Sequence, residues 1–120
     1  MPHDFNAIVD RYVAQWNEPD AAKRRADIAS LWTDDAFHFT KSMEARGHAE
    51  LEARVAGAYE TWVREKGYRF RRCDDVDGHH DTIKLRWRMM DGETVLATGC
   101  DFLMLTEDGR IRLDAQFIEA

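Results

Sequence analysis

Three Asp-Gly dipeptides, at positions 77–78, 91–92 and 108–109, divide the second half of this 120-residue chain into four runs of β-branched, aromatic and aliphatic residues. An Asp-Gly pair between two such runs is typical of a β-hairpin, because a type I′ turn needs positive φ at both central residues. Three pairs in succession therefore predict a four-stranded antiparallel meander. The expected strands cover residues 68–75, 80–90, 94–106 and 110–118.

The first half of the chain shows helical periodicity instead. Apolar residues recur every three or four positions in three stretches, and Asp4, Pro19 and Gly67 are placed to begin or end helices. A short strand is expected at 37–40, before the third helix. Helices followed by strands indicate an α+β fold rather than alternating βαβ units, and the length suits a single domain over 1–120. The three stripes are Phe5, Ile8, Val9, Tyr12 and Trp16; Ile28, Leu31 and Trp32; and Leu51, Val55, Ala58, Tyr59 and Trp62.

Composition excludes several classes of function. A net charge of −6 argues against a nucleic-acid partner, since such affinity comes largely from basic side chains on phosphates. No apolar run approaches the ~20 residues of a membrane span, and the first residues lack the pattern of a secretory signal. Two cysteines without metal-type spacing are expected to be free thiols in a reducing cytoplasm. No phosphate loop, nucleophile elbow or metal motif is present, so we expect no cofactor and no metal.

One expected strand is apolar on both faces. Residues 95–105 read Val-Leu-Ala-Thr-Gly-Cys-Asp-Phe-Leu-Met-Leu, whereas a strand with one wet face should alternate. Helices can cover one face, and the simplest cover for the other is a second copy of the chain. We therefore expect a homodimer through the outer face of the meander, with contacts from Leu96, Cys100, Phe102 and Met104.

The order of these elements resembles the nuclear transport factor 2-like superfamily and its SnoaL-like members. The resemblance covers nearly the whole chain and is carried by short motifs in the same order as in that superfamily. It implies a cone-shaped fold, in which a curved antiparallel sheet (the four-stranded meander plus the short strand) packs against three N-terminal helices. The motifs are Arg11-Tyr12, Leu31-Trp32-Thr33-Asp34-Asp35-Ala36, Gly47, Gly99-Cys100-Asp101-Phe102 and Asp108-Gly109-Arg110-Ile111.

Among these relatives, ketosteroid isomerases offer the nearest chemical comparison. They use a tyrosine and a protonated aspartic acid as hydrogen-bond donors to an enolate. Tyr12 and Asp101 match these two residues, while the position of the proton-moving aspartate matches Thr40. Asp101 stands mid-strand among apolar residues, where a buried carboxyl is protonated or paired. A structural role within the sheet remains the alternative for Asp101, as does a core role for Tyr12.

His38 has two interpretations that depend on strand register. If Thr40 faces the cavity, His38 does too, and its pKa range suits a general base. A slip of one residue turns Phe37 and Phe39 inward and leaves His38 on the surface. We favour the second register, which would make His38 a surface residue.

A similar ambiguity concerns Arg86 and Trp87. A two-residue turn at Asp91-Gly92 puts Arg86 on the face of Asp101, where it would select an anionic or carbonyl-bearing ligand. A longer loop with a bulge puts Trp87 there instead, facing a flat apolar ligand. The cost of burying unpaired cations favours Trp87.

The helical aromatic residues complete the candidate site. Trp16, Tyr59 and Trp62 are expected mainly in the core, with some of them lining the open end of the cone. Two functions remain open for such a cavity. One is cofactor-free acid/base catalysis on a small, largely apolar molecule, with Asp101 as acid or oxyanion donor, Tyr12 assisting and His38 as base. The other is a non-catalytic module that binds a ligand or another protein.

Overall fold

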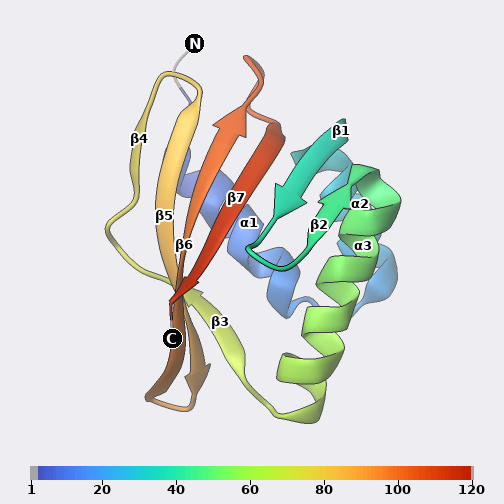
Figure 1. Cartoon of the computed structure of the whole chain (residues 1–120), viewed down its shortest axis with the longest axis vertical. Coiled ribbons are helices and arrows are strands. Elements are labelled where there is room, and N and C mark those ends of the chain that lie inside the picture. Colours follow the sequence, from blue (N-terminus) through green and yellow to red (C-terminus); the bar gives the residue numbers. More distant parts are fainter. Residues whose placement is uncertain (1–2, 120) are drawn as a thin grey trace.

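Three helices pack against a curved, mixed β-sheet in the computed structural model, which describes residues 3–119 (Figure 1). The expected α+β class is confirmed. The helices are α1 (Phe5–Asn17), α2 (Ala21–Leu31) and α3 (Gly47–Ala58), the last continued by the π-helical segment η1 (Tyr59–Glu65). The strands are β1 (Trp32–Phe39), β2 (Glu44–Arg46), β3 (Arg69–Arg72), β4 (Asp77–His79), β5 (Thr82–Asp91), β6 (Thr94–Leu105) and β7 (Ile111–Glu119).

Side-chain caps fix where the first two helices begin. The Asp4 carboxylate accepts a hydrogen bond from the backbone N–H of Ala7, and the Asp20 carboxylate accepts from the N–H groups of Ala22 and Lys23. Each aspartate thus satisfies amide groups that have no partner inside the helix. The predicted stripe of α1 is buried from Ile8 to Trp16, so this helix lies flat against the sheet.

The sheet is mixed rather than purely antiparallel, which corrects one part of the expected architecture. Its strand order is β2-β1-β7-β6-β5-β3, with β4 also paired to β5, and β1 runs parallel to β7. The first strand is also longer than the predicted 37–40. Helix α2 ends at Leu31 instead of near 33–35, and Trp32 already pairs with Ile111 of β7.

The meander is confirmed, but its first turn lies elsewhere than predicted. Residues Asp77 and Gly78 belong to β4, and the hairpin turns at His80, whose φ is 53°. Gly78 is needed for close packing, because a Cβ there would lie 2.7 Å from Cγ of Phe5. The other two Asp-Gly pairs do mark turns, where Gly92 and Gly109 have φ of 58° and 87°.

A bulge in β6 decides which residues of β5 face the helices. Met90 pairs with Val95 but Met89 pairs with Ala97, so Leu96 is the extra residue. Beyond the bulge Trp87 pairs with Gly99 and Leu85 with Asp101. Directly paired residues share a face of the sheet, so Trp87 lies on the face of Asp101. Arg86 is on the opposite face, where it contacts Asp75 and Glu119.

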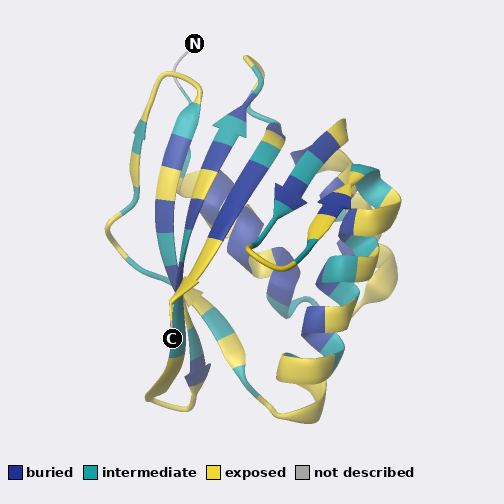
Figure 2. Ribbon diagram, viewed as in Figure 1, coloured by how far each residue is buried: buried dark blue, intermediate teal, exposed yellow. Residues whose placement is uncertain are grey.

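The core lies between the helices and the face of the sheet that they cover. Figure 2 shows buried residues alternating with exposed ones along the central strands, while α1 and α3 turn their buried stripes toward the sheet. Several aromatic side chains meet there, among them Trp32, which is fully buried, and Tyr12, which is 1% exposed. This packing leaves a cavity beside the C-terminal half of α1.

Candidate functional site

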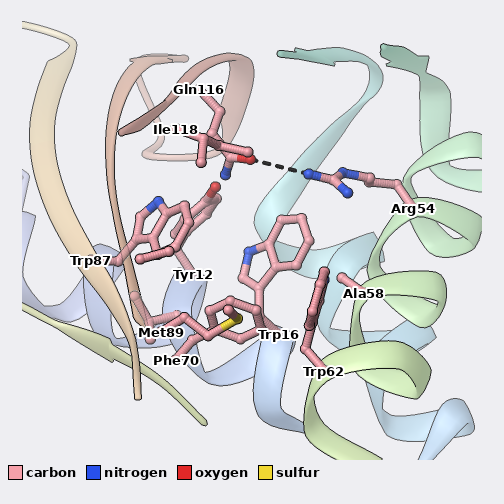
Figure 3. Close-up of a pocket in the computed structure, with 12 residues that line it drawn as sticks. Tyr12, Trp16, Arg54, Ala58, Trp62, Phe70, Trp87, Met89, Gln116 and Ile118 are labelled. Atoms are coloured by element: carbon pink, nitrogen blue, oxygen red, sulfur yellow. Dashed lines mark hydrogen bonds between the residues drawn. The ribbon is translucent and has the colours of Figure 1, made fainter. Parts of the chain in front are cut away.

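A cavity of about 380 Å³ opens between α1, α3, η1 and the covered face of the sheet (Figure 3). Its wall is mostly aromatic and aliphatic, and its size falls in the range of small-molecule sites. Tyr12, Arg54 and Gln116 are the polar exceptions. The lining residues are Tyr12, Val13, Trp16, Arg54, Ala58, Trp62, Phe70, Trp87, Met89, Ala97, Gln116 and Ile118.

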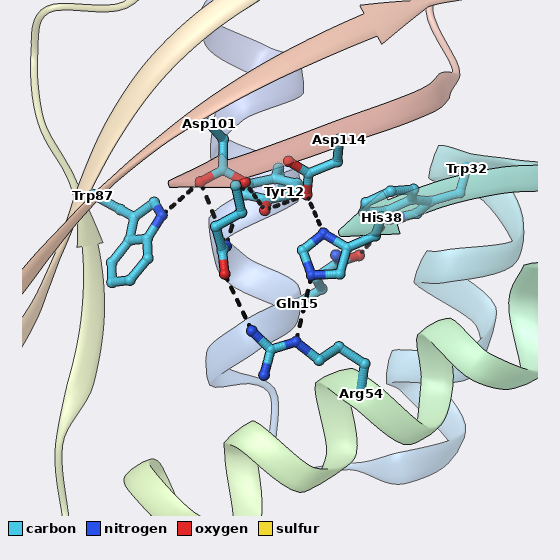
Figure 4. A network of polar contacts seen from close by, with 9 residues as sticks. Tyr12, Gln15, Trp32, His38, Arg54, Trp87, Asp101 and Asp114 are labelled. Carbon is cyan, nitrogen blue, oxygen red and sulfur yellow. Dashed lines mark hydrogen bonds and ion pairs between the residues drawn. The ribbon is translucent and has the colours of Figure 1, made fainter. Parts of the chain in front are cut away.

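Behind Tyr12 lie two buried carboxyl groups. The Tyr12 hydroxyl oxygen is 2.7 Å from Oδ2 of Asp101 and 2.6 Å from Oδ2 of Asp114 (Figure 4). The sheet brings the acids together, since Asp101 pairs with Gln116 and Leu103 pairs with Asp114. Both acids are 0% exposed. Tyr12 therefore separates the cavity from a pair of carboxyl groups that solvent does not reach.

A closed ring of hydrogen bonds links the two acids to His38, Arg54 and Gln116. His38 Nδ1 lies 2.9 Å from Oδ2 of Asp114, and Arg54 donates from Nε to His38 Nε2 at 3.4 Å. Arg54 also donates from Nη2 to Gln116 Oε1 at 3.1 Å. The Gln116 amide nitrogen in turn donates to the Asp101 carboxyl, at 3.3 Å from Oδ2.

The pKa values of both buried acids are raised, that of Asp101 more strongly. Burial, and then the charge of Asp114, raise the pKa of Asp101 well above its usual value. Burial also raises the pKa of Asp114, but its interactions with Asp101 and Tyr12, and the charge of Arg54, oppose that rise. Asp101 is thus the acid that keeps its proton. Burial and both carboxyl groups hold the pKa of the Tyr12 hydroxyl well above 10, so it stays a donor.

One arrangement of protons accounts for the hydrogen bonds of both acids, while Oδ1 of Asp114 forms none with a described residue. Protonated Asp101 donates to the Tyr12 oxygen, and the Tyr12 hydroxyl donates to the Asp114 carboxylate. Asp101 Oδ1 accepts from the indole N–H of Trp87 at 2.7 Å. The Asp114 carboxylate also accepts from His38. Such a connected network inside a protein is more stable than its separate bonds suggest.

His38 is neutral in this arrangement. Its Nε2 accepts a hydrogen bond from Arg54 and so has no proton, although its contact with Asp114 could otherwise be an ion pair. Burial, and then the charge of Arg54, lower the pKa of His38 to about 4. The folded pKa is therefore below the ordinary value, and the stabilisation from neutral His38 is present above pH 6.5 and lost as the pH falls to about 4.

The free energy of unfolding should show this dependence when wild type is compared with His38→Asn. The asparagine retains a donor toward Asp114 but does not titrate. The stability advantage of wild type should shrink by roughly 3 kcal/mol between pH 7 and pH 4. Urea unfolding at four or five pH values measures it, and taking the difference removes the opposing contribution of Asp101. A constant difference would show that folding does not lower the pKa of His38, and one that grows toward pH 4 would show that folding raises it.

The predicted site residues fall into three groups. Tyr12, Trp16, Trp62 and Trp87 line the cavity. Asp101 and His38 belong to the network behind it and are 0% exposed. Arg86 and Tyr59 lie elsewhere, because Arg86 is on the outer face and the ring of Tyr59 packs under the guanidinium of Arg24, 4.7 Å away.

The favoured register for His38 is wrong. His38 points into the protein, whereas Phe37 and Phe39 are partly exposed on the other face, with ring centroids 4.9 Å apart. The guanidinium of Arg46 lies 3.8 Å from the Phe37 ring centroid, and this cation–π contact stabilises an aromatic ring on the partly exposed face. Thr40 lies past the end of β1, where its hydroxyl accepts from the N–H of Ser42.

Three polar residues of the site escaped the sequence analysis. Asp114 and Gln116 alternate along the last strand and so share one face, the period-two signal that could have found them. Arg54 lies three positions after Leu51 and four before Ala58, on the apolar stripe of α3. A charged residue within a stripe of apolar residues is the sequence signal that could have identified Arg54.

Two negative findings bear on chemistry and location. Within residues 3–119 no three His, Cys, Asp or Glu side chains are grouped so that they could hold a metal ion. No helix in the same part of the chain is long and apolar enough to cross a membrane.

Comparison with known proteins identifies the family. The family model for the SnoaL-like domain matches residues 9–113. A search of curated proteins gives no significant match. A candidate isomerase of the SnoaL-like family from Agrobacterium tumefaciens has 26% sequence identity and a TM-score of 0.88, with 97% of each chain covered.

Two further solved structures share the fold at lower identity. A candidate polyketide cyclase from Sinorhizobium meliloti is 14% identical with a TM-score of 0.68, covering 99% of this chain and 95% of its own. A Catenulispora acidiphila protein with a ketosteroid isomerase-like fold, in complex with trimethylamine, is 13% identical with a TM-score of 0.70, covering 91% and 82%. With the family model spanning most of the sequence and the fold in agreement, this chain belongs to the SnoaL-like domain family of the nuclear transport factor 2-like superfamily.

Proposed function

We propose that the protein binds a small, largely apolar molecule carrying a carbonyl or hydroxyl group in the cavity between α1, α3 and the sheet. The observation that carries the proposal is the position of Tyr12. Tyr12 belongs to a mostly apolar cavity wall, and its hydroxyl is backed by a protonated carboxyl, Asp101. Aromatic walls supply contact area, and the hydroxyl supplies an orienting hydrogen bond.

The same arrangement supports cofactor-free acid catalysis. When the Tyr12 hydroxyl turns from Asp114 to a ligand oxygen, protonated Asp101 still donates a hydrogen bond to the tyrosine oxygen. As negative charge develops on the ligand oxygen, the Tyr12 proton moves toward it and the Asp101 proton moves toward Tyr12. Removal of one such donor lowers kcat by about 10²–10³ in well-studied enzymes. Isomerase, cyclase, dehydratase and hydrolase reactions in which negative charge develops on a substrate oxygen can use this step.

The roles of the three proposed catalytic residues differ in consequence. Tyr12 is the catalytic residue, since it is the one that lines the cavity. Asp101 is a positioning residue that acts through Tyr12. His38 is buried between Asp114 and Arg54, and both of its ring nitrogens are used in hydrogen bonds to them. It therefore stabilises the network and is not a base that acts on the ligand.

A second function, binding without turnover, is favoured by a specific observation. Of the residues described, those that line the cavity include no carboxylate and no imidazole. The cavity thus offers proton donors but no group that would accept a proton from carbon near neutral pH. A module that holds its ligand would need nothing more.

Tyr12→Phe should weaken binding of small polycyclic ketones and phenols by about ten-fold, because it removes one hydrogen bond while keeping the ring. Quenching of tryptophan fluorescence reports binding, since Trp16, Trp62 and Trp87 all line the cavity. Tyr68→Phe, on a tyrosine stacked against Trp62 outside the network, is the matched control and should bind as wild type does. Equal affinity in Tyr12→Phe would remove the assignment. Binding without conversion of any compound would favour the module over the enzyme.

We also propose a homodimer through the outer face of the sheet. Phe102 is 38% exposed and Phe117 is 62% exposed. Phe102 pairs with Ala115 and Phe117 pairs with Cys100, so the two phenylalanines lie on the same face of neighbouring strands. Of the predicted contacts, Leu96 is 41% exposed, while Cys100 and Met104 are half-buried. Association would remove this apolar surface from water.

Sedimentation at micromolar concentration should give a dimer, and Phe117→Glu should give a monomer. A charge in the centre of an apolar interface costs more than it does in water. Lys66→Glu, at the exposed end of η1 and outside the outer face of the sheet, provides the control. A wild-type monomer at 50 micromolar or so would end the dimer proposal.

A further inference from the structure

Arg54 stands in the cavity wall as a cation that contacts no carboxylate directly. It is the only charged residue among those that line the cavity, and it is half-buried. No carboxylate of residues 3–119 forms a salt bridge with it. Removing a guanidinium from water without an anionic partner is costly, and burial correspondingly lowers the pKa of Arg54.

The contacts that Arg54 does make are with neutral groups and fix its plane. Nε donates to His38 Nε2 and Nη2 donates to Gln116 Oε1, while the guanidinium carbon lies 5.4 Å from the Trp16 ring centroid. A guanidinium has five N–H donors, so these two bonds leave three. The orientation in Figure 3 keeps the end of the side chain beside Gln116, at the polar end of the cavity.

The two buried acids do not occupy this position. Asp101 keeps its proton and is neutral. Asp114 carries the negative charge, but it contacts His38 Nδ1 while Arg54 contacts Nε2, so the imidazole ring separates them. The charge of Arg54 therefore remains directed toward the cavity.

A second donor, on the tryptophan whose ring lies under the Arg54 guanidinium, also lacks a partner. The indole nitrogen of Trp16, a residue that is 6% exposed, is buried and forms no hydrogen bond with any described residue. Buried N–H groups without an acceptor are rare, and a bound water, ion or ligand is one of the ways in which they are satisfied. Trp16 and Arg54 are neighbours in the cavity wall, and both offer only donors.

We propose that Arg54, assisted by Trp16, forms an anion subsite, and that the ligand class of this cavity is a compact aromatic monocarboxylate. The carboxylate accepts from the remaining guanidinium donors, an arrangement that arginine geometry suits. The ring packs among Phe70, Trp87 and Met89. This inference rests on the proposed small-molecule function and names the charge of its ligand.

Calorimetric titration with 2-naphthoate and with 2-acetonaphthone, its neutral methyl ketone counterpart, tests the inference at neutral pH. Wild type should bind naphthoate at least about ten-fold more tightly than the ketone. Arg54→Gln should weaken naphthoate binding by about ten-fold or more and change ketone binding by less than about three-fold. Arg64→Gln, which removes an exposed arginine paired with Glu60, is the matched control and should change neither.

The outcomes separate this inference from the proposed function. Ketone binding with no preference for naphthoate would overturn the anion subsite and leave the proposed function standing. An equal loss of both ligands in Arg54→Gln would also overturn it, because the arginine would then shape the cavity instead of recognising charge. If Arg54→Gln fails to fold, Arg54→Lys keeps the charge without the planar fork and should bind naphthoate at intermediate affinity. Failure of wild type to bind either compound would defeat both proposals.

Discussion

Gly99→Ala is expected to destabilise the protein by about 3 kcal/mol or more, a large effect for one methyl group. A Cβ at this position would lie 2.6 Å from Nε1 of Trp87, whose ring lies across the glycine. The tryptophan would have to move, which costs about 1–3 kcal/mol in strain. Movement also breaks its 2.7 Å hydrogen bond to Asp101 and leaves a buried acceptor with fewer donors.

Gly57→Ala is the control for Gly99→Ala. Gly57 lies in α3, and a Cβ there meets nothing within 4 Å. Alanine is favoured over glycine in a helix, so this variant should be stabilised by about 0.5–1 kcal/mol. Urea unfolding of both variants measures the two signs. If Gly99→Ala unfolds at the wild-type urea concentration, Trp87 does not lie against residue 99.

Asp114→Ala is expected to cost about 3–5 kcal/mol in the free energy of unfolding. The substitution leaves the Tyr12 hydroxyl and His38 Nδ1 without their acceptor, and it removes the anion that balances Arg54 through His38. Breaking a buried charged network by deleting one member is costly because the partners stay buried.

Asp101→Asn, at the other acid, should cost less than about 1 kcal/mol. An asparagine keeps the shape of the protonated acid, with an oxygen to accept from Trp87 and a donor toward Tyr12. Thermal and urea unfolding at pH 7 compare the two variants. A cost below 1 kcal/mol for Asp114→Ala, or similar large costs for both, would contradict the assignment of the charge to Asp114.

The fold was predictable because its signals are local. Periodicity located the three helices, and strand composition with Asp-Gly pairs located the meander, since each depends on a few neighbouring residues. The misplaced turn at Gly78 shows the limit. Its glycine is required by Phe5, more than seventy positions away, and no local pattern reports that contact.

The site was predictable only in part, because it depends on register. The resemblance named Tyr12 and Asp101 together, and their 2.7 Å contact joins residues 89 positions apart. The face of Trp87 hinged on a bulge at Leu96, which neither propensity nor pattern places. His38 was misjudged because a buried histidine needs partners, and its partners Asp114 and Arg54 come from β7 and α3.

The central claim is that Asp101 is a protonated acid that supports Tyr12 at the end of the cavity. Carbon-13 NMR of the Asp101 side-chain carboxyl during a pH titration tests it most directly. A protonated shift that persists at neutral pH, with a midpoint far above the ~3.9 of a free aspartate, is the predicted result. In Asp114→Asn the midpoint should fall, because the neighbouring negative charge is gone. A wild-type midpoint at or below 3.9 would mean that Asp101 is an ionised carboxylate, and the proton-donating network at the cavity would be contradicted.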